Sequence, residues 1–454
     1  MKKNNCFPLV FILLFSLSIQ AQTKKWTLED CVKYAIDNNI SIKQTELDTK
    51  TADIDKKGAI GNFIPSLNSN ASHSWNVGLN QDPTTGLLRN QTTQYSSVGV
   101  GAGFDIYKGL QNQNTLRKAN LSILAAKYQL TKMQEDVALN VANAFLQVLF
   151  NKENLKVKQE QKAINEKQLA RSEELVKAGS VPRGDLLDIK ATVASDAQNV
   201  ITAENALLIS KLSLAQLLQL KEFYDFDVTD DSSVKDENNI LSQTPIAVYD
   251  KAKEQRTELK IAQTNLEIAE KNVAIAKGAF QPSLQGFYNF NTRISYADTY
   301  ANQNGVVVAQ PAAPFGEQFK DNRGQAFGAQ LSIPIFNGWS VRNNVERNKV
   351  NLEKSKIAVE QEELTLQRNV YTAFTDAKGG LKAYESALSA LDARQEAYNY
   401  AKEKYAVGMM NSFDFNQSQT LYTVAQSEVL RTKYDYIFKI KILEFYFGIP
   451  IIKN

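Results

Sequence analysis

The stretch LVKAGSVPRGDLLD, residues 175–188, decides how the whole chain is interpreted, because a related stretch follows in the second half of the chain. Two glycines and a proline interrupt a helical pattern, and two carboxylates, Asp185 and Asp188, lie one helical turn apart. In the later stretch, YAVGMMNSFDF at 405–415, Gly408 matches Gly179 and Asp414 matches Asp185 (408 − 179 and 414 − 185 both equal 229). A turn that recurs at a fixed offset indicates an internally duplicated chain.

Two further motifs support the duplication. FIPSL at 63–67 recurs as FQPSL at 280–284 (280 − 63 = 217), and DIYKG ending at Gly109 recurs as PIFNG ending at Gly338 (338 − 109 = 229). The offset in numbering thus grows by twelve (229 − 217), so a single insertion separates the two halves at that point. The predicted domains are a first repeat at 22–220, an acidic linker at 221–245 and a second repeat at 246–454.

Apolar residues recur every seven residues on both sides of each glycine turn, which is the spacing of a coiled-coil seam. In the first half they are Leu116, Ile123, Leu130, Val137 and Ala144, then Leu186, Val193, Val200, Leu207 and Leu214. Each half is therefore predicted to hold a long antiparallel helical hairpin, at 110–220 and at 339–448. The segment 110–178 contains neither proline nor glycine, and as a helix it would be about 100 Å long, too long for a compact domain.

Between these motifs the period changes to two, which predicts strands within 66–107 and 283–336. One face would carry Leu67, Ala71, Trp75, Val77 and Leu79, then Val98, Val100, Ala102, Phe104 and Ile106, and in the second half Leu284, Tyr288, Phe290, Ile294, Tyr296, Phe327, Ala329, Leu331, Ile333 and Ile335. Polar residues and glycines occupy the other face, as in a transmembrane β-barrel with a wet interior. The alternative, a soluble hairpin packed on the helices, lacks a spare apolar helix to cover it. Segments 80–94 and 297–325 are predicted loops, and 221–245 a solvated linker.

The N-terminus is predicted to be a secretory signal peptide, residues 1–21. It has Lys2 and Lys3, an apolar run and Ala21 at the expected cleavage position. A membrane anchor is the weaker alternative, because the apolar run falls short of the ~20 residues that span a bilayer. The net charge of +3 includes the two lysines of the signal, so no nucleic-acid partner is expected. After cleavage only Cys31 remains, which excludes an intramolecular disulfide.

Four strands cannot close a barrel, and an open sheet edge in lipid leaves backbone groups without partners. The chain must therefore oligomerise: two copies would give eight strands and a filled interior, and three would give twelve strands and a pore. With the long helices continuing from the strands, the pore would join a tube. The predicted fold is thus mixed and mainly α-helical, with a long antiparallel coiled-coil α-barrel, a transmembrane β-barrel of four strands per chain, and internal duplication.

The ordered duplication of these motifs resembles the TolC family of outer-membrane efflux proteins over essentially the whole mature chain. The resemblance implies a homotrimer in outer-membrane lipid, with helices in the periplasm and tip turns that dock on a periplasmic adaptor protein. Through the adaptor the channel would serve an inner-membrane pump in efflux or type I secretion. Two alternatives stay open: a periplasmic coiled-coil scaffold without a pore, and a general diffusion porin.

The tip turns are the first candidate site. As structural elements, Gly179 and Gly408 are predicted helix-ending glycines, and Pro182 opens the following helix. As functional elements, the turns are predicted to form the adaptor-docking surface, because exposed apolar residues at a remote turn suggest a partner. The docking residues are Gly179, Ser180, Val181, Pro182, Val407, Gly408, Met409 and Met410.

The carboxylates after the turns are the second candidate site. In a trimer each becomes a ring of three, and acidic rings at a constriction select cations, although a carboxylate in a first helical turn also simply favours the helix. The resemblance implies an aspartate pair in the second-half tip, but there Asp414 is followed by Gln417, while Asp185 and Asp188 form the pair in the first half. The family's gate arginine is replaced by Met410, and Arg183 is a candidate substitute.

No enzymatic site, metal site or cofactor is expected. The single histidine, His73, lies in a predicted strand without the partners of a catalytic triad or a metal site. Gly99, Gly101 and Gly103 alternate along a strand and do not open a helix, so they form no phosphate loop. They are expected instead to make room for bulky neighbours.

Overall fold

The computed structural model describes residues 25–81, 88–221, 226–229, 240–303 and 306–451. The predicted signal peptide lies outside these residues. The chain divides into two compact units, each assembled from separated segments: one is residues 1–40, 135–248 and 370–454, and the other is residues 41–134 and 249–369. The first unit contains both tip turns, and the second contains a four-stranded sheet.

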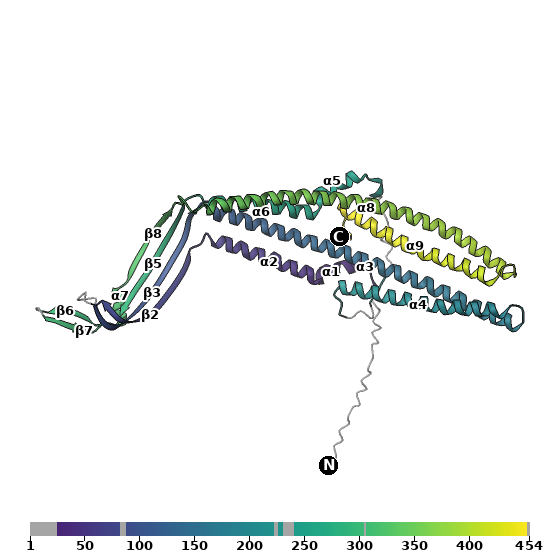
Figure 1. The fold of residues 1–454 in the computed structure, drawn as a ribbon, viewed down its shortest axis with the longest axis horizontal. Helices are drawn as coiled ribbons and strands as arrows, with labels where there is room; N and C mark the ends of the chain where they lie inside the picture. Colours follow the sequence, from purple (N-terminus) through teal and green to yellow (C-terminus); the bar gives the residue numbers. More distant parts are fainter. Residues whose placement is uncertain (1–24, 82–87, 222–225, 230–239, 304–305, 452–454) are drawn as a thin grey trace, which may run out of the picture. The chain divides into compact units, whose positions relative to one another are not determined.

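The helices follow the same order with matching lengths in both halves (Figure 1). They are α1 (Leu28–Asn38) and α5 (Pro245–Gln255) with 11 residues each, α2 (Ile40–Gly61) and α6 (Thr257–Gly278) with 22 each, α3 (Gln111–Lys177) and α8 (Ser340–Ala406) with 67 each, and α4 (Arg183–Leu217) and α9 (Ser412–Phe447) with 35 and 36. The starts of α1 and α5 are offset in numbering by 245 − 28 = 217, and those of α3 and α8 by 340 − 111 = 229, as the sequence motifs are.

Four antiparallel strands form the main sheet in the order β2 (Ser66–Gln81), β3 (Leu88–Lys108), β5 (Ser283–Ser295) and β8 (Gly324–Ser332) (Figure 1). The joint between β3 and β5 connects the first half of the chain to the second. Among the described strands, β2 and β8 are the two edges of this sheet, and each has one strand partner.

The register separates an apolar face from a polar face. Leu67 lies opposite Ala102, Ala102 opposite Tyr288, and Tyr288 opposite Phe327. On the other face, Asn70 and Asn291 flank Gly99. The alternation predicted from the sequence agrees with this register. In the single chain much of the apolar face is exposed, and Phe327 is 83% exposed, but Ile294 is fully buried and the ring of Phe290 lies 6.4 Å from that of Phe319.

Two of the three strand glycines, Gly99 and Gly101, leave space for side chains of neighbouring strands, as the sequence predicted, whereas a Cβ at Gly103 would meet only Oγ of Ser66 at 3.9 Å. A Cβ added at Gly99 would lie 2.7 Å from Oδ1 of Asn70, and one at Gly101 would lie 3.0 Å from Oδ1 of Asn289. The side chains of Asn70 and Asn289 therefore pack directly against the glycine backbone on the polar face.

The predicted loops were wrong in extent. β2 runs to Gln81 and β3 starts at Leu88, so most of segment 80–94 is strand. Segment 297–325 contains a separate hairpin, β6 (Thr299–Gln303) and β7 (Val306–Gln310), and a short helix, α7 (Phe315–Asp321). The polar composition misled the prediction, because strand pairing uses backbone groups and a strand that is not packed in a core needs no apolar side chains.

The last predicted strand was also too long. β8 ends at Ser332, so Ile333 and Ile335 lie beyond it. Pro334 follows at once, and proline has no backbone N–H to donate to a neighbouring strand. Both isoleucines are nevertheless exposed, Ile335 to 94%.

The predicted solvated linker is packed at Phe226, Val228 and Ile240, while its described residues 221 and 242–244 are exposed as predicted. Asp227 and Val228 form β4, which pairs in parallel with β1 (Lys25–Trp26). The carboxylate of Asp227 forms ion pairs with Lys152 at 2.9 Å and Lys211 at 3.0 Å. Burial alone would raise the pKa of Asp227, but hydrogen bonds from the two lysines lower it. Two lysines thus compensate the negative charge of an acidic residue that composition alone assigned to solvent. The short η1 helix (Ile240–Ser242) follows later in the same segment.

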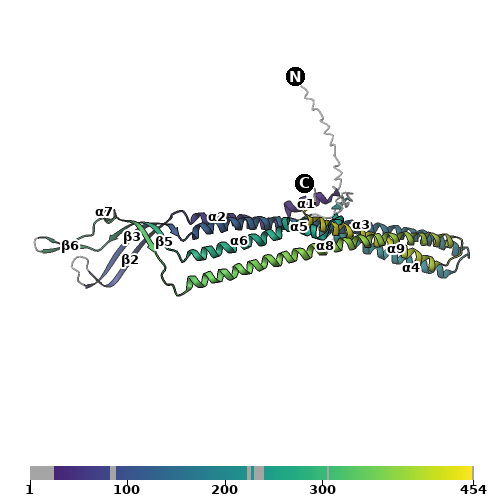
Figure 2. The ribbon, with the colours of Figure 1, turned by 90° about the horizontal axis from the view of Figure 1, so that it is seen from above.

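Aromatic rings hold the second helical hairpin, α8–α9, together. Tyr398 stacks on Tyr422 with ring centroids 5.2 Å apart, and Tyr405 stacks on Phe415 at 4.7 Å. α8 and α9 lie side by side in both ribbon views (Figures 1 and 2). Among the described helices, none has the length and apolar character needed to cross a membrane.

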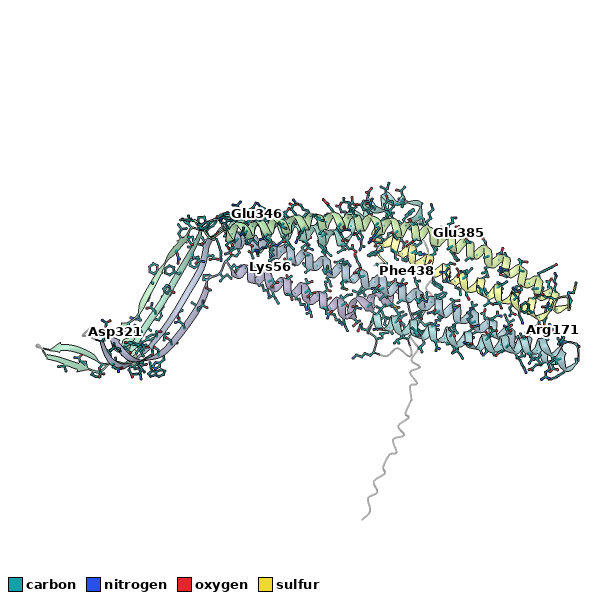
Figure 3. The ribbon with its side chains drawn as sticks, in the orientation of Figure 1. Lys56, Arg171, Asp321, Glu346, Glu385 and Phe438 are labelled. Carbon is teal, nitrogen blue, oxygen red and sulfur yellow. The ribbon has the colours of Figure 1, made fainter. Side chains whose placement is uncertain are left out.

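Exposed ion pairs lie along α8. Glu346 pairs with Lys349 at 2.8 Å and Glu385 with Lys382 at 2.6 Å, each one helical turn apart; the two glutamates are labelled in Figure 3. Such surface pairs contribute about 0–1 kcal/mol each. These pairs therefore add little to the stability of the helix.

Candidate functional site

The first tip turn is a glycine-terminated helix end. Gly179 has φ 71°, a left-handed conformation that glycine adopts without strain. The amide of Ser180 donates to the carbonyl of Leu175 at 2.9 Å, and that of Gly179 to Val176 at 3.0 Å. These two bonds satisfy the carbonyls that the end of α3 would otherwise leave open. Pro182 precedes α4 as its N-cap residue, so the predicted roles of Gly179 and Pro182 in the turn agree with the geometry.

The second tip turn repeats this geometry and adds a side-chain cap. Gly408 has φ 77°, and the amide of Met409 donates to the carbonyl of Lys404 at 2.8 Å. Asn411 is the N-cap of α9: its Oδ1 accepts from the amide of Asp414 at 2.8 Å, and its Nδ2 donates to Oδ2 of Asp414 at 2.9 Å. Asp414 therefore has a structural role in starting the helix, whatever else it does.

The exposed apolar residues of the turns differ in part from those expected. Val407 is 70% exposed and Met409 76%, whereas the expected exposure of Val181 and Met410 was wrong, since both are half-buried. These two occupy equivalent places, two residues after the turn glycine, so the position in the turn sets the exposure. Phe413, 69% exposed, was missed because the prediction covered only residues 407–410 of the second turn.

The candidate gate residues lie on two different hairpins. Asp185 is half-buried in the first turn of α4, and Asp188 and Arg183 are exposed there, while Asp414 and Gln417 are exposed on α9. Among the residues that the structure describes, Asp185, Asp188 and Arg183 form no side-chain hydrogen bond or ion pair, and no group of three or more His, Cys, Asp or Glu side chains could hold a metal ion. Within one chain, Asp188 is therefore exposed without a side-chain partner, whereas the carboxylate of Asp414 already accepts from Asn411.

Behind the turns, α3, α4 and α9 are joined by a partly buried polar seam, which we define as Lys158, Gln161, Asn165, Asp196, Gln419 and Thr423. Nε2 of Gln419 donates to Oδ1 of Asn165 at 2.8 Å, and Nδ2 of Asn165 donates to Asp196. Asn165 is 1% exposed and Gln419 2%. The hydroxyl of Thr423 donates to Oε1 of Gln161 at 2.7 Å.

The seam also lines a cavity of about 440 Å³ between these helices. Lys158 donates to the hydroxyl of Ser427 at 3.2 Å and attracts the nearby Asp196 electrostatically. Burial lowers the pKa of Lys158 and raises that of Asp196, because each charge loses water and the other only partly compensates.

The sequence contains a pattern that would have located Lys158 and Asn165 of the polar seam. The seven-residue spacing that runs from Leu116 to Ala144 continues as Asn151, Lys158, Asn165 and Ser172. Three of these polar residues, Asn151, Asn165 and Ser172, are buried. A polar residue at a core position of a coiled coil specifies the register of the helices at a cost in stability.

The raised pKa of Asp196 predicts that the α4 region is stabilised by mild acid. The folded protein binds a proton at Asp196 at a pH where the unfolded chain does not, so this contribution to stability grows as pH falls towards 4 and is lost as pH rises through the raised pKa. Hydrogen exchange of the α4 amides, corrected for the intrinsic pH dependence, should show slower opening near pH 4 than at pH 7.5. Asp196→Asn should remove this difference and Asp188→Asn, at an exposed site, should preserve it; a difference that survives in Asp196→Asn contradicts the prediction.

Comparison with known proteins identifies the family of this chain. Residues 32–219 and 248–441 match the family described as outer membrane efflux protein. The chain belongs to this family. Its members are transport conduits of the outer membrane and not enzymes, so this outer membrane efflux protein is located in the outer membrane as an exit duct of an efflux system.

Individual relatives agree with the family over most of their length. The efflux protein is 22% identical over 388 residues to the outer membrane protein TolC of Vibrio cholerae, which covers 83% of this chain and 80% of that protein. It is 24% identical over 375 residues to the cation efflux system protein CusC of Escherichia coli O157:H7, covering 80% and 72%. A solved membrane protein from Pseudomonas aeruginosa has the same fold, with a TM-score of 0.79, 18% identity and 93% of both chains covered.

Proposed function

We propose that three copies of the chain form a closed barrel of twelve strands in the outer membrane, continued by helices in the periplasm. The observation that carries the proposal is the sheet: among the described residues it has four strands, an apolar face with large exposed side chains such as Phe327, Leu331 and Val77, and two edges with one strand partner each. An apolar face is stable against lipid, but an open edge is not, because the membrane interior offers no water to its backbone groups. Closure by further copies removes both edges.

We further propose that the tip turns dock on a periplasmic adaptor protein, through which the channel serves an inner-membrane pump. The exposed Val407, Met409 and Phe413 support this, because they gather apolar surface at one turn. The first turn contributes Ser180 and Pro182, which are exposed but not apolar enough to bind alone. The partner surface is therefore expected to be apolar opposite the second turn.

Mass and conductance test the channel. The detergent-solubilised protein should have three times the mass of its mature chain by light scattering and should open a low-conductance pore in planar bilayers. A periplasmic scaffold would instead purify without detergent, and a general diffusion porin would give a high conductance. A monomer without a pore would refute the proposed function. A deletion strain tested both for drug and metal sensitivity and for loss of secreted proteins would identify the cargo class.

Divalent cations should block the pore from the tip side by binding to the aspartate rings. Asp185→Asn, Asp188→Asn or Asp414→Asn removes three charges per trimer, so at least one variant should raise the half-blocking concentration about tenfold, equal to ~1.4 kcal/mol. Asparagine at 414 retains an oxygen that can accept from Asn411 and so preserves the helix cap. Asp392→Asn, at an exposed site on α8, serves as the control. Unchanged block in all three variants would leave the aspartates as helix-starting residues only.

A further inference from the structure

One tight joint connects the two halves of the chain, where the turn after β3 meets the end of α6. Gly109 and Gly278 approach so closely that a Cβ added at Gly109 would lie 2.1 Å from the carbonyl oxygen of Gly278, and one at Gly278 would lie 2.4 Å from that of Gly109. Beside them, the hydroxyl of Tyr107 donates to Oε1 of Gln281. The β3–β5 ladder continues from this contact.

The joint has two sides, the turn at Gly109 and the end of α6 at Gly278, which we call half-joints. Each half-joint has an equivalent with the same backbone geometry in the other half of the chain. Gly109 and Leu110 have φ 59° and 58°, and their counterparts in the second half, Gly338 and Trp339, have φ 61° and 66°. For a non-glycine residue this left-handed conformation is uncommon, so its recurrence at Trp339 is not a property of the residue type. The joint-forming turn is therefore present in both halves.

The α6 side of the joint is likewise repeated at the end of α2. The amide of Gln281 donates to the carbonyl of Gly278 at 3.0 Å, and at the equivalent place in the first half the amide of Ile64 donates to Gly61 at the same distance. In the single chain, however, a Cβ added at Gly61 or Gly338 would meet no atom within 4 Å. The half-joints at Gly61 and Gly338 thus have the backbone geometry of the joint but no partner among the described residues of the chain.

We propose that these two half-joints meet between chains: Gly338 of one copy packs against Gly61 of the next, as Gly109 packs against Gly278 within a chain. The partner is a second copy of this chain, and the inference rests on the proposed trimer but goes further by assigning the contacts. β8 then pairs with β2 of the next copy. Shifting the β3–β5 register by the two offsets gives the pairs Phe327 with Trp75, Ala329 with His73, and Leu331 with Ala71.

The chemistry of the joint between chains differs from that within the chain. The hydrogen-bonded pair of Tyr107 and Gln281 is replaced by Phe336 and Ile64, which are 78% and 61% exposed in the single chain. Two residues that are polar together in one joint are thus apolar together in the other. A mismatched joint of Phe336 with Gln281 would bury an amide without a partner, which disfavours wrong assembly.

Disulfide cross-linking tests the register. Leu331→Cys combined with Ala71→Cys places two thiols at directly paired strand positions, where Cβ atoms lie about 4.5–5.5 Å apart. Oxidation should give covalent dimers and trimers at least about tenfold above either single-cysteine variant, whereas Leu331→Cys with Trp75→Cys, four residues out of register, should not. Ala102→Cys with Tyr288→Cys, the equivalent pair within the chain, should close a bridge without changing the mass. Cys31 is fully buried and does not compete.

A glycine pair on α2 provides a second test that leaves the strands unchanged. Gly61→Leu should fold as a single chain, since its surroundings there are open, but should lose most of its trimer. Gly58→Ile, also at an open site, introduces the residue that the second half carries at the equivalent position 275 and should assemble normally. Full assembly of Gly61→Leu would overturn the glycine contact.

The outcomes separate the joint from the trimer itself. Trimers by light scattering without cross-linking at 331 and 71 would overturn the assigned register and preserve the proposed function. A chain that remains monomeric in every variant, including the unmodified protein, would overturn both.

Discussion

Gly278→Ala is expected to open the joint between the two halves of the chain and to remove most of the assembled protein from the outer membrane. The new Cβ would lie 2.4 Å from the carbonyl oxygen of Gly109, and a backbone atom cannot move aside as a flexible side chain can. Overpacking of this kind costs about 1–3 kcal/mol, and the contact with backbone places this substitution at the upper end of that range. The amount of heat-modifiable protein in membrane fractions and its denaturation midpoint measure the effect.

Gly379→Ala is the matched control for this substitution. Gly379 lies within α8, and a Cβ added there meets no atom within 4 Å. Alanine is a better helix former than glycine by roughly 0.5–1 kcal/mol, so this variant should be as stable as the unmodified protein or more stable. Equal denaturation midpoints for the two variants would show that the close approach of Gly109 and Gly278 is not needed.

Val100→Arg should prevent insertion of the sheet into the membrane. Val100 lies on the apolar face, directly opposite Phe290 of the neighbouring strand. An arginine on the lipid face of a transmembrane sheet costs about 2–4 kcal/mol at the bilayer midplane, and the proposed trimer would carry that cost in all three copies. We expect the protein to be lost from the outer membrane and to accumulate in the periplasm as a degraded or aggregated chain, measured by fractionation and immunoblotting.

Asn289→Arg tests the opposite face of the same two strands. Asn289 pairs with Gly101 on the polar face, so its replacement faces the wet interior of the proposed barrel. This variant should insert normally and alter only the conductance. If Val100→Arg inserts as well as Asn289→Arg, the apolar face does not contact lipid and the scaffold alternative gains support.

Local patterns in the sequence were sufficient for much of the fold. The seven-residue spacing predicted the long hairpins, and the alternation of residues such as Leu67 and Asn68 predicted the two faces of the sheet. Gly179 and Gly408 identified the turns, because only a residue without a side chain adopts their left-handed backbone without strain. Each of these features depends on residues close together in the chain, which is why the sequence alone determined them.

Features that depend on pairing between distant residues became visible only in the tertiary structure. The polar segment 80–94 is mostly strand because β2 and β3 supply each other's backbone partners, and Asp227 is packed because Lys152 and Lys211 neutralise it. The contact of Asn165 with Gln419 joins residues 254 positions apart. The two offsets revealed the repeat itself. They did not reveal that Gly109 contacts Gly278 while Gly61 and Gly338 have no such neighbour among the described residues of one chain. A sequence offset gives the equivalence of two residues, and only the packing of the backbone decides which of the equivalent contacts is made within one chain.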